Sequence, residues 1–170
     1  MMLKPQDIVI LLKLVCQGSE RWSYNQLAYE LVMSPAEVHA GIKRTIQSGL
    51  FDPHQRCPIK QALFEFLKHG IRYSFPPDRG GPTRGMPTGS IAAPLLDEFV
   101  EVDENPVWPT PDGERRGYEF SPLYKTAPQA AQKDQGLYEL LSLVDAIRGG
   151  RTRERNQAIL ELEKRLFQGE

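Results

Sequence analysis

The strongest constraint on the fold is a helix start at residues 34–37, which follows closely on an earlier helical pattern. Ser34 suits an N-cap, Pro35 suits the first helical position, and Glu37 stands three residues after the cap. Apolar residues then recur at four-residue spacing, at Val38, Ile42 and Ile46. These signals predict a helix with one buried face that ends at Gly49.

Two earlier helices complete the pattern. Residues 4–17 carry one apolar stripe that ends at Gly18, and a shorter helix over 24–32 starts after the N-cap Ser23. Two helices joined by a short turn, with a third covering their backs, form a helix-turn-helix arrangement. We expect this motif in residues 4–50. The alternative is a plain three-helix bundle with a solvated charged face.

The outward side of the third predicted helix has the composition of a DNA-reading helix. Small side chains near its start let the backbone approach base edges, and basic or amide side chains further along reach phosphates or base acceptors. Residues 1–75 hold nine Lys and Arg against six Asp and Glu, which agrees without being decisive. Gly41 inside the helix predicts close packing against a neighbour. The candidate DNA contacts here are Ser34, Ala36, His39, Ala40, Lys43, Arg44 and Gln47.

The order of these residues resembles a known family. The winged helix-turn-helix of bacterial MarR-like regulators has a similar cadence to three stretches, Asn25-Gln26-Leu27-Ala28, Ser34-Pro35-Ala36-Glu37-Val38 and Ser48-Gly49-Leu50. The resemblance covers residues 4–90 approximately. It implies binding to double-stranded DNA, although a minority of winged-helix proteins have become protein-interaction modules.

After Leu50 the sequence departs from that family, which usually forms its wing at once. We expect a loop over 51–58, a helix over 58–69, a strand over 71–75 and a glycine- and proline-rich loop over 76–87. The wing is therefore expected in the later loop, where arginines can grip phosphate without reading bases. The candidate residues for this role are Arg72, Arg79 and Arg84.

The second half of the chain is expected to contain two further units. Residues 91–127 read as an acidic, proline-rich connector in water, between a domain over 1–90 and a C-terminal helical hairpin over 128–170. Each hairpin helix has one apolar stripe, which can cover the other helix, the helix-turn-helix core or a second copy of the chain. The expected fold class is mainly α with a small β component, a winged helix-turn-helix domain plus this hairpin.

Other classes of protein find little support in the sequence. Cys16 and Cys57 are too few for a disulfide framework and lack metal-ligand spacing. We expect no metal, no cofactor and no catalytic residue, and therefore no enzyme. Apolar runs fall far short of the roughly 20 residues that span a membrane, and no signal pattern is present. A cytoplasmic protein without a membrane partner is expected.

The expected function is sequence-specific binding of double-stranded DNA by a transcriptional regulator. A homodimer is expected because one recognition helix reads few base pairs, whereas a two-fold dimer reads two half-sites. The C-terminal hairpin is the expected dimer contact and a candidate surface for a protein partner. The alternative is a winged-helix interaction module, such as an antitoxin or an adaptor in a larger complex.

Overall fold

A computed structural model describes residues 1–99 and 105–168 of the chain. Helices dominate it, and short strands form two small sheets. The expectation of a mainly α fold with a small β component is therefore confirmed. One apolar core runs through both halves of the chain.

The first three helices lie close to their predicted positions. They are α1 (Pro5–Gln17), α2 (Tyr24–Leu31) and α3 (Pro35–Gln47). Ser23 and Ser34 cap α2 and α3 as expected, since each hydroxyl accepts a hydrogen bond from a backbone N–H of the first turn. A Cβ added at Gly41 would lie 2.5 Å from Ile10 Cδ1 of α1. The expected close packing at Gly41 is confirmed.

The segment after α3 is a hairpin and not the loop expected over 51–58. β1 (Phe51–Asp52) pairs antiparallel with β2 (Cys57–Pro58) across a tight turn. The Asp52 carboxylate stabilises this turn by accepting a hydrogen bond from the His54 N–H at 2.8 Å. The turn residues were recognisable in the sequence, but strands of two residues are too short to show the alternation that predicts pairing.

The next region is helical where a strand was expected over 71–75. α4 (Lys60–His69) is followed by the short helix α5 (Ile71–Ser74). Ile71 is completely buried in the core. The β-branched and aromatic composition of this stretch therefore reflects packing, which outweighs any intrinsic strand preference.

Three strands from separate parts of the sequence form the second sheet. They are β3 (Arg79–Pro87), β4 (Pro106–Pro109) and β5 (Arg115–Phe120). β3 pairs antiparallel with both other strands, and β4 pairs parallel with β5, so that each strand contacts the other two. A short 3₁₀ helix, η1 (Gly89–Ile91), follows β3.

These strands correct two expectations. The stretch over 76–87 is mostly β3 and not a loop, and the stretch over 91–127 contributes two strands to the sheet. Val107 and Trp108 of β4 are almost completely buried, so this region is not a connector lying in water. Its glycines and prolines hid the strands, because both residue types are rare in strand interiors.

Three helices complete the chain. They are α6 (Ala127–Lys133), α7 (Gln135–Gly149) and α8 (Thr152–Leu166). α7 and α8 form the expected hairpin, but every residue from Leu140 to Arg148 of α7 is buried. α7 packs on α1, α5, α6, η1 and α8, which corrects the idea of a separate, exposed C-terminal unit.

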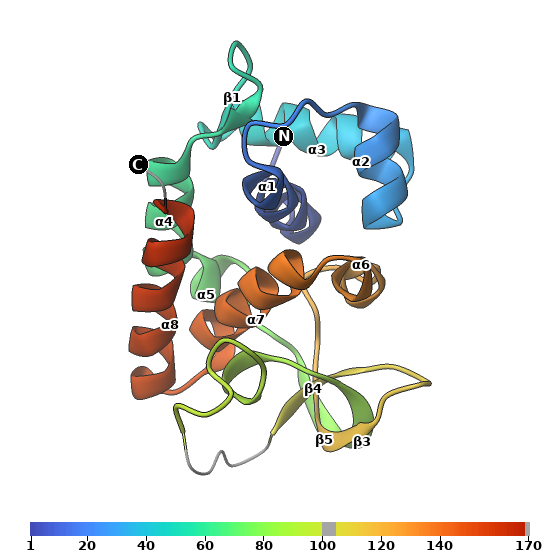
Figure 1. The fold of residues 1–170 in the computed structure, drawn as a ribbon, viewed down its shortest axis with the longest axis vertical. Helices are drawn as coiled ribbons and strands as arrows, with labels where there is room; N and C mark the ends of the chain where they lie inside the picture. The colour runs from blue at the N-terminus through green and yellow to red at the C-terminus, as the bar shows by residue number, and fades with distance from the viewer. Residues whose placement is uncertain (100–104, 169–170) are drawn as a thin grey trace.

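Figure 1 shows α3, α1, α7 and the three-stranded sheet at successive levels along the long axis, with α4 and α8 beside each other along one side. We call α1, α2, α3 and the β1–β2 hairpin the helical end, and β3, β4, β5 and η1 the sheet end. The two ends lie on opposite sides of α7 (Figure 1). Among the described residues, no helix combines the length and the apolar character needed to cross a membrane.

Candidate functional site

The outward face of α3 is the first element of a candidate site. The opposite face of α3 is buried through Val38 and Ile42. Spacings of three and four residues place the side chains predicted to contact DNA on one side of the helix. The residues of this exposed face are Ala36, His39, Lys43 and Gln47, with Ala40 partly exposed among them. The structure thus brings together most of the contacts predicted on this helix.

Arg44 does not belong to this face. It is only 8% exposed and turns toward α1, where its Nε and Nη2 atoms donate to the two Asp7 carboxylate oxygens at 2.7 and 2.8 Å. Asp7 is completely buried, and the hydrogen bonds to its carboxylate raise the pKa of Arg44. This corrects the prediction of Arg44 as a DNA contact, because the guanidinium neutralises a buried carboxylate.

The start of α3 is fixed by a capping box and by the second half of the chain. Ser34 Oγ accepts from the Glu37 N–H at 3.1 Å, and the Glu37 carboxylate accepts from the Ser34 N–H at 2.6 Å. The Tyr124 hydroxyl donates to the same carboxylate. This contact lowers the pKa of Glu37 and raises the pKa of Tyr124 to about 12. Ser34 remains exposed at the positive end of the helix dipole.

The tip of the β1–β2 hairpin adds exposed residues that the sequence analysis missed, His54, Gln55 and Arg56. Arg56 Cζ lies 4.3 Å from the centre of the Trp22 ring, and Trp22 Nε1–H donates to the Arg56 carbonyl at 3.0 Å. The available signal was a turn with a nearby arginine directly after Leu50, where the resembling family forms its wing.

Aromatic rings connect the hairpin tip to α3. Trp22 packs edge-on against Tyr24 with ring centroids 5.3 Å apart, and the Tyr24 ring lies 4.9 Å from the His39 ring. Contacts therefore run without a break from Arg56 through the two rings to His39. We define the α3–hairpin surface as the exposed face of α3, the hairpin tip and these two rings.

Lys125 is a further cation near this surface that sequence reading missed. It is exposed, and its charge contributes to the lowered pKa of Glu37, which places it near the start of α3. The neighbouring Tyr124 holds this segment on Glu37. No local pattern could have shown this, since the contact joins segments far apart in the sequence.

The three arginines expected to form a wing do not reach this surface. Arg79 and Arg84 lie on β3 at the sheet end, and Arg72 lies on α5, which packs on α7 (Figure 1). The Arg72 guanidinium stacks 4.5 Å from the Tyr73 ring, and Arg84 stands opposite Arg116 in the sheet. This corrects the prediction that the three arginines form one wing-like or phosphate-gripping unit, because Arg72 lies on a different element from Arg79 and Arg84.

The α3–hairpin surface offers cations, hydrogen-bond donors and stacked rings. Across residues 1–99 and 105–168, no three His, Cys, Asp or Glu side chains are grouped so that they could hold a metal ion. Comparison of the chain with protein-family models, curated proteins and solved structures gives no match.

Proposed function

We propose that the chain binds double-stranded DNA through the α3–hairpin surface, as a winged helix-turn-helix regulator of transcription. The observation that carries the proposal is the position of Arg56. The hairpin directly follows α3, and the Trp22 ring holds Arg56 beside the face that carries His39 and Lys43. A basic hairpin next to an exposed helix of this composition supports the resemblance to MarR-like regulators.

The parts of the surface take different roles in this proposal. α3 enters the major groove, where Ala36 lets the backbone approach and where Lys43 and Gln47 reach base edges or phosphates. Arg56 contacts the adjacent phosphate backbone or a narrow minor groove. Lys125 faces phosphate near the start of α3, where the N-terminal N–H groups also favour an anion.

We further propose that the protein is cytoplasmic and forms a homodimer, in which each protomer reads one half-site of the DNA. α7 is buried against other elements of the same chain, so we place the dimer contact on the outer side of α8. Leu160 there is 57% exposed and lines a shallow depression together with Phe64 and Phe167, which Gln61, Glu163 and Lys164 border. Exposed apolar surface of this kind supports an interface.

A binding experiment with matched variants tests the DNA proposal. Fluorescence anisotropy compares a duplex from the region upstream of the protein's own gene with a random duplex. Lys43→Ala should weaken specific binding about tenfold and random binding less, because a base contact is lost. Arg56→Ala should weaken both alike and reduce the slope of log affinity against log salt by about 1.

The matched control is Arg84→Ala, which removes an exposed arginine at the sheet end. It should bind both duplexes as the wild type does. The proposal fails if the wild type binds neither duplex at physiological salt, or if Arg84→Ala weakens binding as much as Arg56→Ala does. In the second case, general charge and not this surface would account for the affinity.

A protein-interaction module is a second candidate. With Arg44 buried, Lys43 is the one exposed lysine or arginine among the residues of α3, all of which the structure describes. Ile46 of α3, Tyr29 of α2 and Val32 at the C-cap of α2 are exposed apolar side chains. Co-purification with the product of an adjacent gene would favour this function if Ile46→Asp abolishes it. The same variant should bind DNA as the wild type does, so that the loss concerns the protein partner alone.

A further inference from the structure

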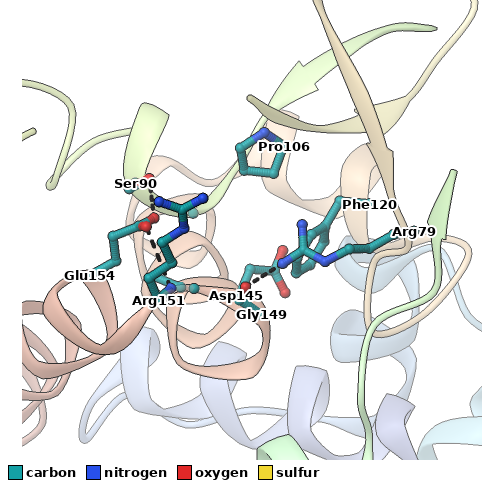
Figure 2. A pocket seen from close by; sticks show the side chains of 11 residues that line it. Arg79, Ser90, Pro106, Phe120, Asp145, Gly149, Arg151 and Glu154 are labelled. Carbon is teal, nitrogen blue, oxygen red and sulfur yellow. Dashed lines mark hydrogen bonds between the residues drawn. The ribbon is translucent and has the colours of Figure 1, made fainter. Parts of the chain in front are cut away.

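A cavity at the sheet end is lined by residues that the proposed DNA binding does not use. It has a volume of about 340 Å³ and lies where β3, β4, β5 and η1 meet the end of α7 and the start of α8 (Figure 2). Such a volume admits a small molecule. The side chains that give the cavity its chemistry are Arg79, Ser90, Phe120, Asp145, Arg151 and Glu154.

Arg79 brings a positive charge to this cavity. Its guanidinium carbon lies 5.2 Å from the centre of the Phe120 ring, and its Nη2 donates to the Gly149 carbonyl at the end of α7. An added Cβ at Gly149 would lie 2.7 Å from that nitrogen, so the glycine leaves room for the guanidinium. Within the described part of the chain, Arg79 pairs with no carboxylate. A guanidinium has five N–H donors, so the single hydrogen bond to Gly149 leaves Arg79 with donors for a ligand in the cavity that it lines.

The start of α8 forms the opposite wall. Arg151 extends into the cavity from this side, toward the space that Arg79 also faces (Figure 2). One Glu154 oxygen accepts from the Arg151 backbone N–H at 3.4 Å, and the other accepts from the Ser90 hydroxyl at 2.7 Å. Glu154 is thereby held as a fixed acceptor, and the positive end of the α8 dipole adds to the potential of the arginines.

The buried carboxylate of the lining is neutralised by its own partners. Asp145 Oδ1 accepts from Arg148 Nη1 at 2.7 Å. Asp145 Oδ2 accepts from Thr88 Oγ1 at 2.7 Å and from Trp108 Nε1 at 2.8 Å. These donors occupy both oxygens, so Asp145 forms a polar floor and does not repel an anion as an unpaired charge would.

We propose that this cavity binds a small organic anion, with a phosphate or carboxylate group between Arg79 and Arg151 and a hydroxyl or amino group donating to Glu154. Guanidinium groups match both acids, because each presents parallel N–H donors to two oxygens. The fixed Glu154 oxygens select a ligand whose far end carries a hydrogen-bond donor. This site does not depend on the proposed DNA binding, since no residue of the α3–hairpin surface lines it.

Calorimetric titration of the full chain, without DNA, tests this site. The probes are ribose 5-phosphate, L-malate and inorganic phosphate, with uncharged ribose as the control ligand. We expect ribose 5-phosphate or malate to bind and ribose to bind no more than weakly. Whichever of these two binds more tightly identifies the acid that the arginines accept.

Variants locate the binding in the cavity. Arg79→Gln and Arg151→Gln should each weaken the binding of that probe about tenfold or more, since each removes a charge-assisted hydrogen bond. Arg84→Gln on the same strand and Arg153→Gln on α8 should bind as the wild type does, because neither lines the cavity. Circular dichroism checks that each variant is folded. If loss of the Gly149 contact unfolds Arg79→Gln, then Arg151→Gln alone tests whether the cavity binds the probe.

The proposal is overturned if no charged probe binds the wild type at millimolar concentration. It is also overturned if ribose binds as tightly as ribose 5-phosphate, or if both cavity variants bind the charged probes unchanged. Failure of the DNA experiment leaves these measurements unaffected, because they use a different end of the molecule.

Discussion

The helical end and the sheet end are each held by a buried ion pair, but the two pairs are built differently. At the helical end, Arg44 of α3 reaches across to Asp7 of α1. Facing the sheet end, Asp145 and Arg148 lie on successive turns of α7, and Asp145 accepts hydrogen bonds from Thr88 and Trp108 of that end. The first pair joins two helices directly, whereas the second joins α7 to strand β4 and to the N-cap of η1 through neutral hydrogen-bond donors. The difference predicts which substitutions each end tolerates.

The largest effect should come from removing one partner of the pair at the helical end. Arg44→Ala leaves Asp7 buried and without its guanidinium, which typically costs about 3–5 kcal/mol of the free energy of unfolding. Lys43→Ala is the matched control, because it removes an exposed cation one residue away. Urea denaturation measures both. A change for Arg44→Ala no larger than that for Lys43→Ala would show that this pair does not hold α1 on α3.

A second contrast adds one methyl group at each end. At Gly85 an added Cβ would overlap the Trp108 carbonyl oxygen, and paired strands cannot easily separate to admit it. At Gly41 the Cβ would meet Ile10 Cδ1 at 2.5 Å and Asp7 Oδ1 at 2.9 Å; the end of Ile10 can shift, although Asp7 is held by Arg44. Overpacking costs about 1–3 kcal/mol, with Gly85→Ala expected near the upper value.

Gly41→Ala should cost less, because the helix propensity of alanine offsets about 1 kcal/mol of the strain. Thermal unfolding of both variants measures the difference. Equal losses, or a greater loss for Gly41→Ala, would mean that the strand pairing is more adaptable than the α1–α3 contact.

The same contrast explains how much of the fold could be predicted from the sequence. α1, α2 and α3 were predictable because caps, stops and apolar spacing are local signals, and Ser23, Ser34 and Gly41 act as their patterns indicate. The sheet was not predictable, since β3 pairs with strands that lie far along the chain and its own residues are rich in glycine and proline.

The candidate site shows the same limit at the level of single residues. Helical periodicity placed His39, Lys43 and Gln47 on one face, but it could not show that Arg44 turns to a buried carboxylate of another helix. Arg56 lies near α3 because its guanidinium stacks on the Trp22 ring, and no local sequence pattern indicates this contact between separate segments. Long-range contacts therefore decide which charged residues reach the surface.

A smaller effect compares one indole hydrogen bond at each end. Trp108→Phe keeps an aromatic ring in the core but removes a donor to the buried Asp145 carboxylate, which should cost about 1–3 kcal/mol. Trp22→Phe removes a donor to the exposed Arg56 carbonyl, which water can satisfy, so its effect on stability should be much smaller. Guanidinium denaturation of both variants gives the comparison. A loss for Trp22→Phe that matches the loss for Trp108→Phe would contradict it.

The smallest effect concerns the contact that joins α1 of the helical end to the start of α7. Lys13 Nζ lies 2.7 Å from Asp134 Oδ2 and 3.4 Å from Glu30 Oε2, and Asp134 also caps α7 by accepting from the Leu137 N–H at 3.1 Å. Asp134→Asn removes the charge but keeps a capping side chain, so it should cost about 1 kcal/mol or less. Asp134→Ala also loses the cap and should cost about 1 kcal/mol more.

The pH dependence gives this last prediction its sign. Burial raises the pKa of Asp134, but the hydrogen bonds from Lys13 and Leu137 and the charge of Lys13 outweigh burial, and the net shift is downward from 3.8. A lowered pKa in the folded state means that the pair stabilises the protein above the ordinary carboxyl pKa and is lost as the pH falls through the lower value. The difference in unfolding free energy between wild type and Asp134→Asn should therefore be full at about pH 7 and shrink below about pH 4. Urea titrations across this range measure it, and a constant or growing difference toward acid would show that the charge on Asp134 does not stabilise the junction between α1 and α7.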